Sequence, residues 1–469
     1  MTDTRPTYYE YLDTARLLAE YPLDFVDRYR SVSVDELRSI QNERFLRCVE
    51  TAWRTPFYRR LWGAAGIERG DVTSIDHLEL FPTYDKNDLM ASVERFPPFG
   101  DYGTLVDTPS ARIPPIVLHT TSGTTGRPQP LIFGPWSREV QNLLVGRMYR
   151  AQGVDHTDIV HSVYGHGLIN GGHYLREAVT RFTTALFLSA GTGNETRSER
   201  QVEVMHEFGV TTLIGFSDYL RKLAQVASEK GLVAGRDIAI RRIIAHFGAE
   251  DRGPIAEAWG STPDAPVATY DWYGVGDTGC IAGEIPGSEG MMIWEDAHLV
   301  EILDIDTAAP VPTGDRGDLV VSCLFKDDCY PIIRFNTHDV FAFRPGVASN
   351  GLPFRRLSGF LGRSDNMVKL KGINVFPHAF GGILDGLGDP DLTGEFVCVL
   401  TNDRGGGESL HVQVEHRTAT STDAYTYEAM FAQRLGVRVG VTLVEPGATS
   451  PLTEVERRQK PIRLIDQRG

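Results

Sequence analysis

The sequence predicts an α/β protein with a large N-terminal part and a small α+β C-terminal domain. At 469 residues the chain is too long for one compact core, which indicates at least two domains. From Asp155 onward, short apolar runs alternate with helical patterns, as expected for parallel strands covered by helices. After Asp365 the pattern changes to two strands and a helix, which is typical of a smaller α+β unit.

Residues 8–60 are predicted to be helical, because apolar side chains recur there at three- and four-residue intervals. The segment Thr55–Tyr58 is expected to end that helix, since the residue before Pro56 is pushed out of the helical region. Two strand-like apolar runs come next, at Ile113–Leu118 and Leu131–Phe133. They are expected to flank the loop between them.

That loop is rich in hydroxyl residues and glycines. It contains Ser122, Gly123, Thr124, Thr125, Gly126 and Arg127. Glycines allow the backbone to turn with its N–H groups facing inward, and such a turn can cradle a polyphosphate. The loop lacks the Gly-Lys-Ser/Thr of the Walker phosphate loop, and a solvated surface loop is the alternative interpretation.

Five strands are predicted in the α/β part, and ligands of such folds bind in the loops after the strand ends. The predicted strands are 158–164, 184–188, 211–216, 243–247 and 267–270. A polar helix is expected over Glu195–Phe208. A second helix is expected after Ser217, which is well placed to cap it. That second helix has apolar residues on one face and is expected to stop at Gly231.

Several of the loops after these strands carry chemically capable side chains. They are Tyr164–Gly172, Phe247–Glu250, Asp271–Gly279 and Pro331–Asp339. The glycines of the first loop do not match the GxGxxG dinucleotide fingerprint, so a Rossmann interpretation is weak. In the C-terminal part, Glu395–Thr401 and Glu408–Glu415 are predicted as strands and Ala424–Leu435 as a helix.

Composition limits the class of function. The hydrophobic content of 41% and charged content of 23% are those of an ordinary globular protein, with no apolar run long enough to cross a bilayer. A net charge of −15 argues against nucleic-acid binding. Five scattered cysteines without a CxxC pair, and an N-terminus without the pattern of a signal peptide, predict a reduced cytoplasmic setting.

Taken together, these segments resemble the acyl-adenylate-forming (ANL) superfamily, and most closely its phenylacetate–coenzyme A ligase-like branch. The resemblance runs from Thr55 to Lys460, and the order of the motifs makes it specific. It implies a large N-terminal adenylation domain of layered sheets and helices over residues 1–364, and a mobile C-terminal lid over residues 365–469. The family first joins a carboxylate to ATP, releasing pyrophosphate, and then passes the acyl group to coenzyme A.

The resemblance also implies roles for single residues. The expected nucleotide-binding residues are Ser122, Gly123, Thr124, Thr125, Gly126, Arg127, Gly248, Ala249, Glu250, Tyr273, Gly274, Asp339 and Arg363. Of these, Asp339 matches the acid that accepts both ribose hydroxyls. Asp277 matches an acid that helps to hold Mg²⁺, and Asp365 matches the hinge of the lid. Lys460 matches the lid lysine whose cation stabilises charge developing on the α-phosphate.

The expected acyl pocket is more polar than one built for a plain phenyl ring. Its predicted residues are Tyr164, His166, Gly167, Asn170 and Phe247. His166 and Asn170 suggest a hydroxylated or aminated aromatic acid. The chain also departs from the family at Asp277, where glutamate is usual, and at Asn336, where arginine is usual. The alternatives without function are turn-capping roles for Asp339 and Asp365, a solvated position for Lys460, and structural roles for His166 and His246.

Three hypotheses result. The first is an ATP- and Mg²⁺-dependent ligase that adenylates an aromatic acid and transfers it to coenzyme A. The second is a diazotase that activates nitrite as an adenylate for attack by an aryl amine. The third is a degenerate nucleotide-binding protein, against which the retention of Asp339, Arg363 and Lys460 argues. The oligomeric state, a homodimer included, stays open.

Overall fold

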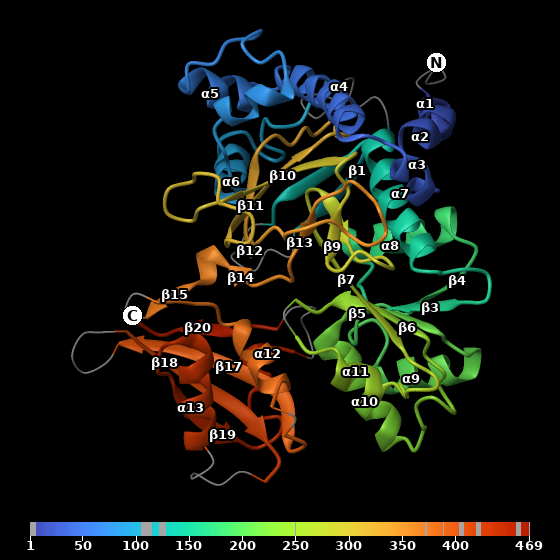
Figure 1. The fold of residues 1–469 in the computed structure, drawn as a ribbon, viewed down its shortest axis with the longest axis vertical. Helices are drawn as coiled ribbons and strands as arrows, with labels where there is room; N and C mark the ends of the chain where they lie inside the picture. The colour runs from blue at the N-terminus through green and yellow to red at the C-terminus, as the bar shows by residue number, and fades with distance from the viewer. Residues whose placement is uncertain are drawn as a thin grey trace. The chain divides into compact units, whose positions relative to one another are not determined.

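The computed structural model describes residues 6–104, 115–121, 128–248, 250–370, 373–387, 389–402, 408–418, 424–455 and 461–468. The chain forms two compact units, each built from separate stretches of sequence (Figure 1). Unit 1 comprises residues 1–159, 165–189 and 270–358, and unit 2 comprises residues 160–164, 190–269 and 359–469. Among the described helices, none is long and apolar enough to cross a membrane.

Unit 1 begins with a series of helices. They are α1 (Tyr8–Tyr11), α2 (Thr14–Glu20), α3 (Phe25–Arg30), α4 (Val34–Ala52), α5 (Pro56–Ala64), the 3₁₀ helix η1 (Ile75–Leu80) and α6 (Lys86–Arg95). The helical prediction for 8–60 is confirmed, but the role given to Thr55–Tyr58 was wrong. Helix α4 already ends at Ala52, and Thr55 begins α5 by accepting the N–H of Tyr58. Pro56 is the first residue of α5, where a missing N–H is harmless.

The strands of unit 1, apart from β4, pair antiparallel with one another. The remaining elements are β1 (Val117–Thr120), β2 (Pro130–Phe133), α7 (Pro135–Ala151), α8 (Asn170–Phe182), β4 (Leu186–Ser189), β7 (Ala268–Val275), β8 (Gly279–Gly283), β9 (Met291–Ile293), β10 (His298–Leu303), β11 (Gly317–Cys323), β12 (Phe335–Phe341) and β13 (Arg356–Leu357). Strands β13, β9, β8 and β7 are adjacent in that order, and β10, β11 and β12 are adjacent in another sheet. The strand predicted at Ile113–Leu118 begins later, at Val117, and its first two residues lie outside the described ones.

Helix α7 forms much of the interior of unit 1, beside α8 (Figure 1). Its Arg147 is fully buried and donates two hydrogen bonds of 2.7 Å to the carboxylate of Asp296, which is also fully buried. Tyr29 of α3 donates a third, at 3.1 Å. Burial alone would raise the pKa of Asp296, but Arg147 holds it below the ordinary value. This ion pair therefore stays charged inside the core.

Unit 2 contains three of the five strands predicted in the α/β part, and the other two are β4 and β7, given above with unit 1. Its first elements are β3 (Ile159–Ser162), α9 (Ser198–Phe208), β5 (Thr212–Phe216), α10 (Ser217–Glu229), β6 (Arg242–His246) and α11 (Gly253–Ala258). Strands β3, β5 and β6 pair in parallel. The capping prediction for Ser217 was wrong: Phe216 is the N-cap residue and Ser217 is already helical. The apolar face predicted for α10 is confirmed, because Leu220, Leu223 and Ala227 are buried.

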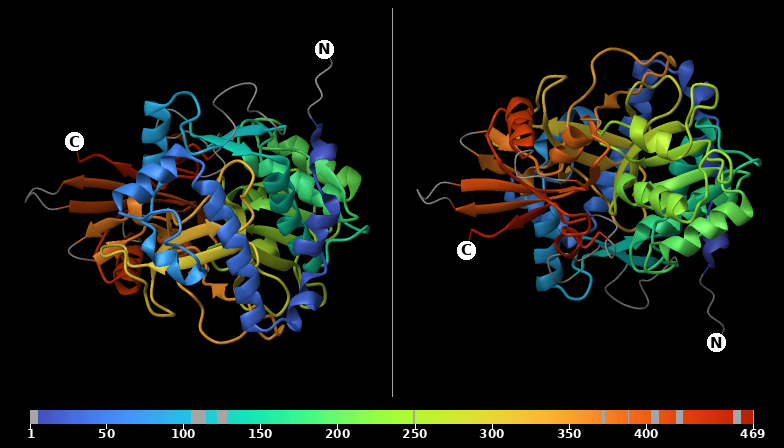
Figure 2. Two further views of the ribbon diagram at one scale, coloured as in Figure 1. Left: turned by 90° about the horizontal axis from the view of Figure 1, so that it is seen from above. Right: turned by 90° about the horizontal axis from the view of Figure 1, so that it is seen from below.

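The C-terminal part of unit 2 has the predicted α+β pattern. Its elements are β14 (Gly362–Arg363), the 3₁₀ helix η3 (Ser364–Asn366), β15 (Val368–Leu370), β16 (Ile373–Val375), α12 (Ala379–Asp385), β17 (Leu392–Asn402), β18 (Glu408–His416), α13 (Ala424–Leu435), β19 (Gly440–Val444), α14 (Ser450–Thr453) and β20 (Leu464–Asp466). The sheet order is β19-β18-β17-β20, and both views in Figure 2 place α13 on one face of this sheet. Tyr427 and Phe431 of α13 pack there with Cys398 and Val412.

We predict that Arg147→Leu destabilises the protein by about 3–5 kcal/mol, because it leaves the carboxylate of Asp296 buried without its partner. The shift of the urea unfolding midpoint measures this loss. Arg30→Leu, which removes the exposed ion pair with Asp27, is the matched control and should cost less than about 1 kcal/mol. Equal shifts for the two variants would contradict the prediction.

Candidate active site

The hairpin of β1 and β2 flanks the glycine-rich loop. The two strands pair antiparallel, with Thr120 opposite Pro130, and the N–H of Thr121 donates to the carbonyl of Gln129 at 3.1 Å. On its other side, the N–H of Thr120 donates to the carbonyl of Leu168 at 2.9 Å. The loop residues 122–127 lie outside the described ones, so their role in phosphate binding stays a prediction.

Asp277 lies in the turn between β7 and β8 and is almost fully buried. Its Oδ1 accepts hydrogen bonds from Gln129 Nε2 at 2.6 Å and from the hydroxyl of Tyr330 at 2.8 Å. Its backbone carbonyl accepts a bond from Lys326 Nζ at 2.8 Å. Burial raises the pKa of Asp277, while Tyr330, Lys326 and Gln129 counteract that rise. The carboxylate is therefore held in one orientation by groups from other segments of the chain.

The carboxylate of Asp277 fits a hard cation. Among the described residues, none donates a hydrogen bond to Oδ2, which leaves one carboxylate oxygen available to a ligand. Magnesium prefers such oxygens and is commonly held through one or two carboxylates together with substrate phosphates. Asp277 can therefore supply one ligand to Mg²⁺, and a bound nucleotide would have to supply others.

Tyr273 and Asp339 lie next to each other in unit 1. The hydroxyl of Tyr273 donates to Asp339 Oδ2 at 2.7 Å, and both side chains are buried. Strand β7 breaks register with β8 between Tyr273 and Gly274. A side chain at Gly274 would meet the carbonyl oxygen of Gly279 at 2.3 Å, so only glycine fits this position. The break in β7 thus places the Tyr273 hydroxyl on the carboxylate predicted to bind ribose.

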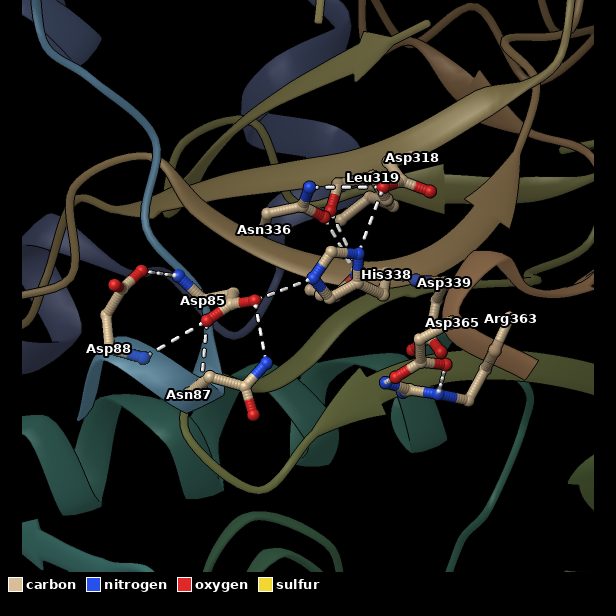
Figure 3. A network of polar contacts seen from close by, with 11 residues as sticks. Asp85, Asn87, Asp88, Asp318, Leu319, Asn336, His338, Asp339, Arg363 and Asp365 are labelled. Carbon is tan, nitrogen blue, oxygen red and sulfur yellow. Dashed lines mark hydrogen bonds and ion pairs between the residues drawn. The ribbon is translucent and has the colours of Figure 1, made fainter. Parts of the chain in front are cut away.

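Asn336 and His338 precede Asp339 on β12 and bind acids of other elements (Figure 3). Asn336 donates to Asp318 at 3.1 Å, and the His338 ring contacts Asp318 and Asp85. These two carboxylates raise the pKa of His338 to about 10. Because the pKa of His338 is raised in the folded protein, its ion pairs with Asp318 and Asp85 stabilise the fold fully below the ordinary pKa of histidine. This stabilisation is lost as the pH rises through about 10.

In unit 2, Gly248 and Glu250 occupy the predicted nucleotide loop, and Ala249 lies outside the described residues. Gly248 has φ +61, and a side chain there would meet the carbonyl oxygen of Phe360 at 2.9 Å. Glu250 accepts a 2.9 Å bond from Arg221, which also donates to Asp385 at 3.0 Å. Burial raises the pKa of Glu250 to about 8, against the attraction of Arg221.

Arg363 and Asp365 pair with each other. Arg363 Nε lies 2.8 Å from Asp365 Oδ1, and Arg363 Nη2 lies 2.6 Å from Asp365 Oδ2, an ion pair drawn in Figure 3. The predicted hinge acid is thus bound to the predicted nucleotide arginine in this structure. Lys460 lies outside the described residues, so its place near the phosphate stays a prediction.

Three predicted pocket residues of unit 1 lie in or beside the loop after residue 164. His166 Nε2 is 3.0 Å from the hydroxyl of Ser189, and Asn170 donates to Gln141 at 3.1 Å. The carbonyl of Gly167 accepts a 2.8 Å bond from His173. The two other predicted residues belong to unit 2, where Tyr164 packs on Phe216 with ring centres 4.9 Å apart and Phe247 is buried.

Sequence reasoning gave no role to two histidines that lie beside the predicted pocket residue His166. His119 of β1 lies 4.9 Å from His173 of α8 between ring centres, and His173 lies 5.8 Å from His166. His119 is buried, and its Nε2 has no hydrogen-bond partner among the described residues. Burial, and then the neighbouring His173, lower the pKa of His119 to about 4. His119 lies just before the hydroxyl-rich loop, a signal that could have drawn attention to it.

Four residues close to Asp277 or Asp339 were also given no role from the sequence. They are Gln129, Lys326, Tyr330 and His338. His338 could have been suspected, because it stands next to the predicted ribose acid. Lys326 gives no such signal, since its buried ammonium lies against the rings of Phe133 and Tyr330 only in the folded protein.

Comparison with known proteins identifies the class of this fold, which combines the layers of unit 1, the parallel strands of unit 2 and a separate C-terminal sheet. It is the fold of an adenylate-forming enzyme. The sequence model of the AMP-binding enzyme C-terminal domain matches residues 372–468. Among solved structures, 2-hydroxyisobutyryl-CoA ligase in its postadenylation state with R3-HIB-AMP aligns with a TM-score of 0.80 at 25% identity. That alignment covers 94% of this chain and 91% of the other. The predicted fold class is confirmed.

The relatives by sequence name the family. Phenylacetate-coenzyme A ligase of Pseudomonas putida is 31% identical over 366 residues, which cover 75% of this chain and 76% of that protein. The enzyme of the same name from Aromatoleum evansii is 29% identical over 454 residues, which cover 93% and 96%. The chain belongs to the phenylacetate–coenzyme A ligase-like family of the adenylate-forming (ANL) superfamily. It is an enzyme of this adenylate-forming CoA ligase family.

We predict that Gly248→Ala destabilises the protein by at least about 1–2 kcal/mol, because alanine is strained at positive φ and its Cβ would crowd Phe360. The shift of the melting temperature measures the effect. Gly167→Ala is the matched control: its added Cβ meets nothing within 4 Å, and the expected cost is within about 0.5 kcal/mol. A Gly248→Ala protein as stable as the control would refute the steric argument.

Proposed function

We propose that the protein is an ATP-dependent ligase that adenylates a polar aromatic carboxylic acid and transfers the acyl group to coenzyme A. The observation that carries the proposal is the Tyr273–Asp339 pair, a buried carboxylate fixed by a 2.7 Å hydrogen bond. A carboxylate held in this way is suited to accept hydrogen bonds from two neighbouring hydroxyls, as a ribose presents them. The relatives' names supply the acceptor, coenzyme A, and an aromatic acid, phenylacetate.

In the proposed first step, a carboxylate oxygen of the acid attacks the α-phosphorus of ATP, and pyrophosphate leaves. The residues 122–127 would hold the departing phosphates, and Lys460 would stabilise the charge on the α-phosphate. Asp277 would hold Mg²⁺ through Oδ2, and the metal would neutralise phosphate charge. Gln129 and Tyr330 would keep Oδ2 turned toward it by binding Oδ1.

In the proposed second step, the sulfur of coenzyme A attacks the acyl carbonyl, a thioester forms, and AMP leaves with its phosphate oxygen. The thiol proton must be lost for this attack, because the thiolate is the nucleophile. The hinge of the lid would lie at Asp365, and its rotation would have to break the ion pair of Asp365 with Arg363.

The polar groups of the pocket support the class of acid. His119, His166, His173 and Asn170 all lie in or beside the segments that meet at Thr120 and Leu168. His119 is neutral at ordinary pH and has a nitrogen without a partner among the described residues, so it can bond a substrate hydroxyl or amine. A site built to bond such a group rejects the analogue that lacks it, because its own polar atoms are then unpaired.

A screen of pyrophosphate release tests this proposal. Purified enzyme with ATP and Mg²⁺ is given phenylacetate, hydroxylated and aminated benzoates and phenylacetates, and nitrite with aryl amines. We expect release with a hydroxylated or aminated acid, and a thioester when coenzyme A is added. Release with nitrite and an aryl amine alone would establish the diazotase, and no release with any compound would leave a nucleotide-binding protein.

We predict that Asp339→Ala weakens ATP binding and leaves binding of the acid unchanged. Of the two substrates, Asp339 would contact only ATP, through its ribose, and hydrogen bonds to a charged group contribute about 1.5–3 kcal/mol. Calorimetry with ATP and with the acid separately measures both affinities. Equal losses for the two ligands would contradict the role given to Asp339.

A further inference from the structure

Strand β12 departs from its neighbour β11 immediately before Asp339. Val320 faces Asn336 and Asp318 faces Val340, so the single residue Leu319 lies opposite residues 337–339. Within this bulge the hydroxyl of Thr337 donates to the carbonyl of Leu319 at 2.9 Å. A bulge of this kind redirects the side chains beside it. Here it directs Asp339 toward Tyr273.

The backbone of the bulge is strained at His338, whose φ is +57. Residues other than glycine adopt this left-handed conformation rarely, although histidine and asparagine do so more often than most. Such a conformation persists only where the surroundings determine it. The N–H of His338 donates to Asn336 Oδ1 at 2.8 Å, which closes the turn from within the strand.

The His338 ring is held from both sides by carboxylates of two other elements. Nδ1 lies 3.2 Å from Asp318 Oδ2 of β11, and Nε2 lies 3.0 Å from Asp85 Oδ2 (Figure 3). Asp85 is the N-cap of α6, and its Oδ1 accepts the N–H groups of Asn87 and Asp88. The ring therefore ties the bulge to the start of a helix and to the neighbouring strand.

The charges make this arrangement a rigid one. Both ring nitrogens face carboxylate oxygens, so both must donate, and the ring is an imidazolium. The side chain of Asp318 is buried, and those of His338 and Asp85 are about three-quarters buried. His338 lowers the pKa of Asp85 to about 2. His338 and Asp85 thus stay charged across the range in which enzymes work.

We propose that His338 is a positioning residue for Asp339: its ring, clamped between Asp85 and Asp318, fixes the left-handed turn that holds the ribose carboxylate against Tyr273. This inference rests on the proposed function, because it takes Asp339 to bind the ribose of ATP. His338 itself touches no substrate in this scheme. Its removal should therefore affect the nucleotide through its ribose hydroxyls and leave the acid unaffected.

The test uses nucleotides with and without those hydroxyls. Binding of ATP and of 2′,3′-dideoxyATP is measured by calorimetry without the acid, so that no turnover occurs, for the wild-type enzyme, His338→Asn, Asp339→Ala and the double variant. Asparagine tolerates positive φ, so His338→Asn removes the clamp without adding backbone strain. His77→Asn makes the same substitution at a partly exposed histidine of unit 1 outside the clamp and serves as the control.

We expect His338→Asn to weaken ATP binding by about tenfold and dideoxyATP binding by less than about twofold. Asp339→Ala should abolish the preference for ATP, and adding His338→Asn to it should cause no further loss, because the two residues act on one contact. In turnover, the KM for ATP should rise by about tenfold while the KM for the acid and kcat stay within about threefold. His77→Asn should match the wild type.

Equal weakening of both nucleotides by His338→Asn, or no effect on either, would overturn the proposal. Retention of the ATP preference in Asp339→Ala would overturn the assignment of Asp339 to the ribose, and with it the role of His338. This failure is distinguishable from a failure of the His338 proposal alone, because it appears in the Asp339→Ala variant. Should His338→Asn fail to fold, Asp85→Asn provides the same test. Asparagine is as good an N-cap as aspartate, so this variant keeps α6 and removes only the charge that faces His338. It should show the same ATP-selective loss, and its absence would overturn the proposal.

Discussion

The hydrogen bond from Tyr273 to Asp339 joins two strands at the points where each breaks register with its neighbour. Strand β7 is irregular between Tyr273 and Gly274, and β12 is irregular before Asp339. A regular strand would point successive side chains to alternate faces and leave these two groups directed by the sheet alone. The irregularities release them from that alternation. The geometry of the site therefore depends on how the two breaks are held.

Each break is held by groups that the regular ladder does not supply. At β7, Gly274 lets the chain approach Gly279 more closely than a side chain would allow. At β12, the charged clamp around His338 supports a turn that is strained. A buried charge is tolerated only when it is paired and hydrogen-bonded, and the Arg147–Asp296 pair obeys the same rule in the core. The site and the core of unit 1 thus rely on the same kind of compensation.

Local pattern predicted much of the fold and less of the site. The strands and helix of the C-terminal part were predictable, because alternation and helical spacing are properties of neighbouring residues. Helix ends were less predictable: Ser217 misses its predicted role by one residue, and Thr55 begins a helix where the end of one was expected. Contacts such as that of Gln129 with Asp277, 148 positions away, leave no trace in a single sequence.

The shorter acid at position 277 is understandable in this structure. The side chain of aspartate is one methylene shorter than that of glutamate and reaches less far. The position of its carboxylate therefore depends more on where the backbone lies. Lys326 binds the backbone carbonyl of Asp277, and its ammonium rests against the rings of Phe133 and Tyr330. Tyr330 then binds the carboxylate as well. Backbone and carboxylate are thus fixed by one cluster, in which a buried cation anchors the turn and leaves the second carboxylate oxygen to a ligand.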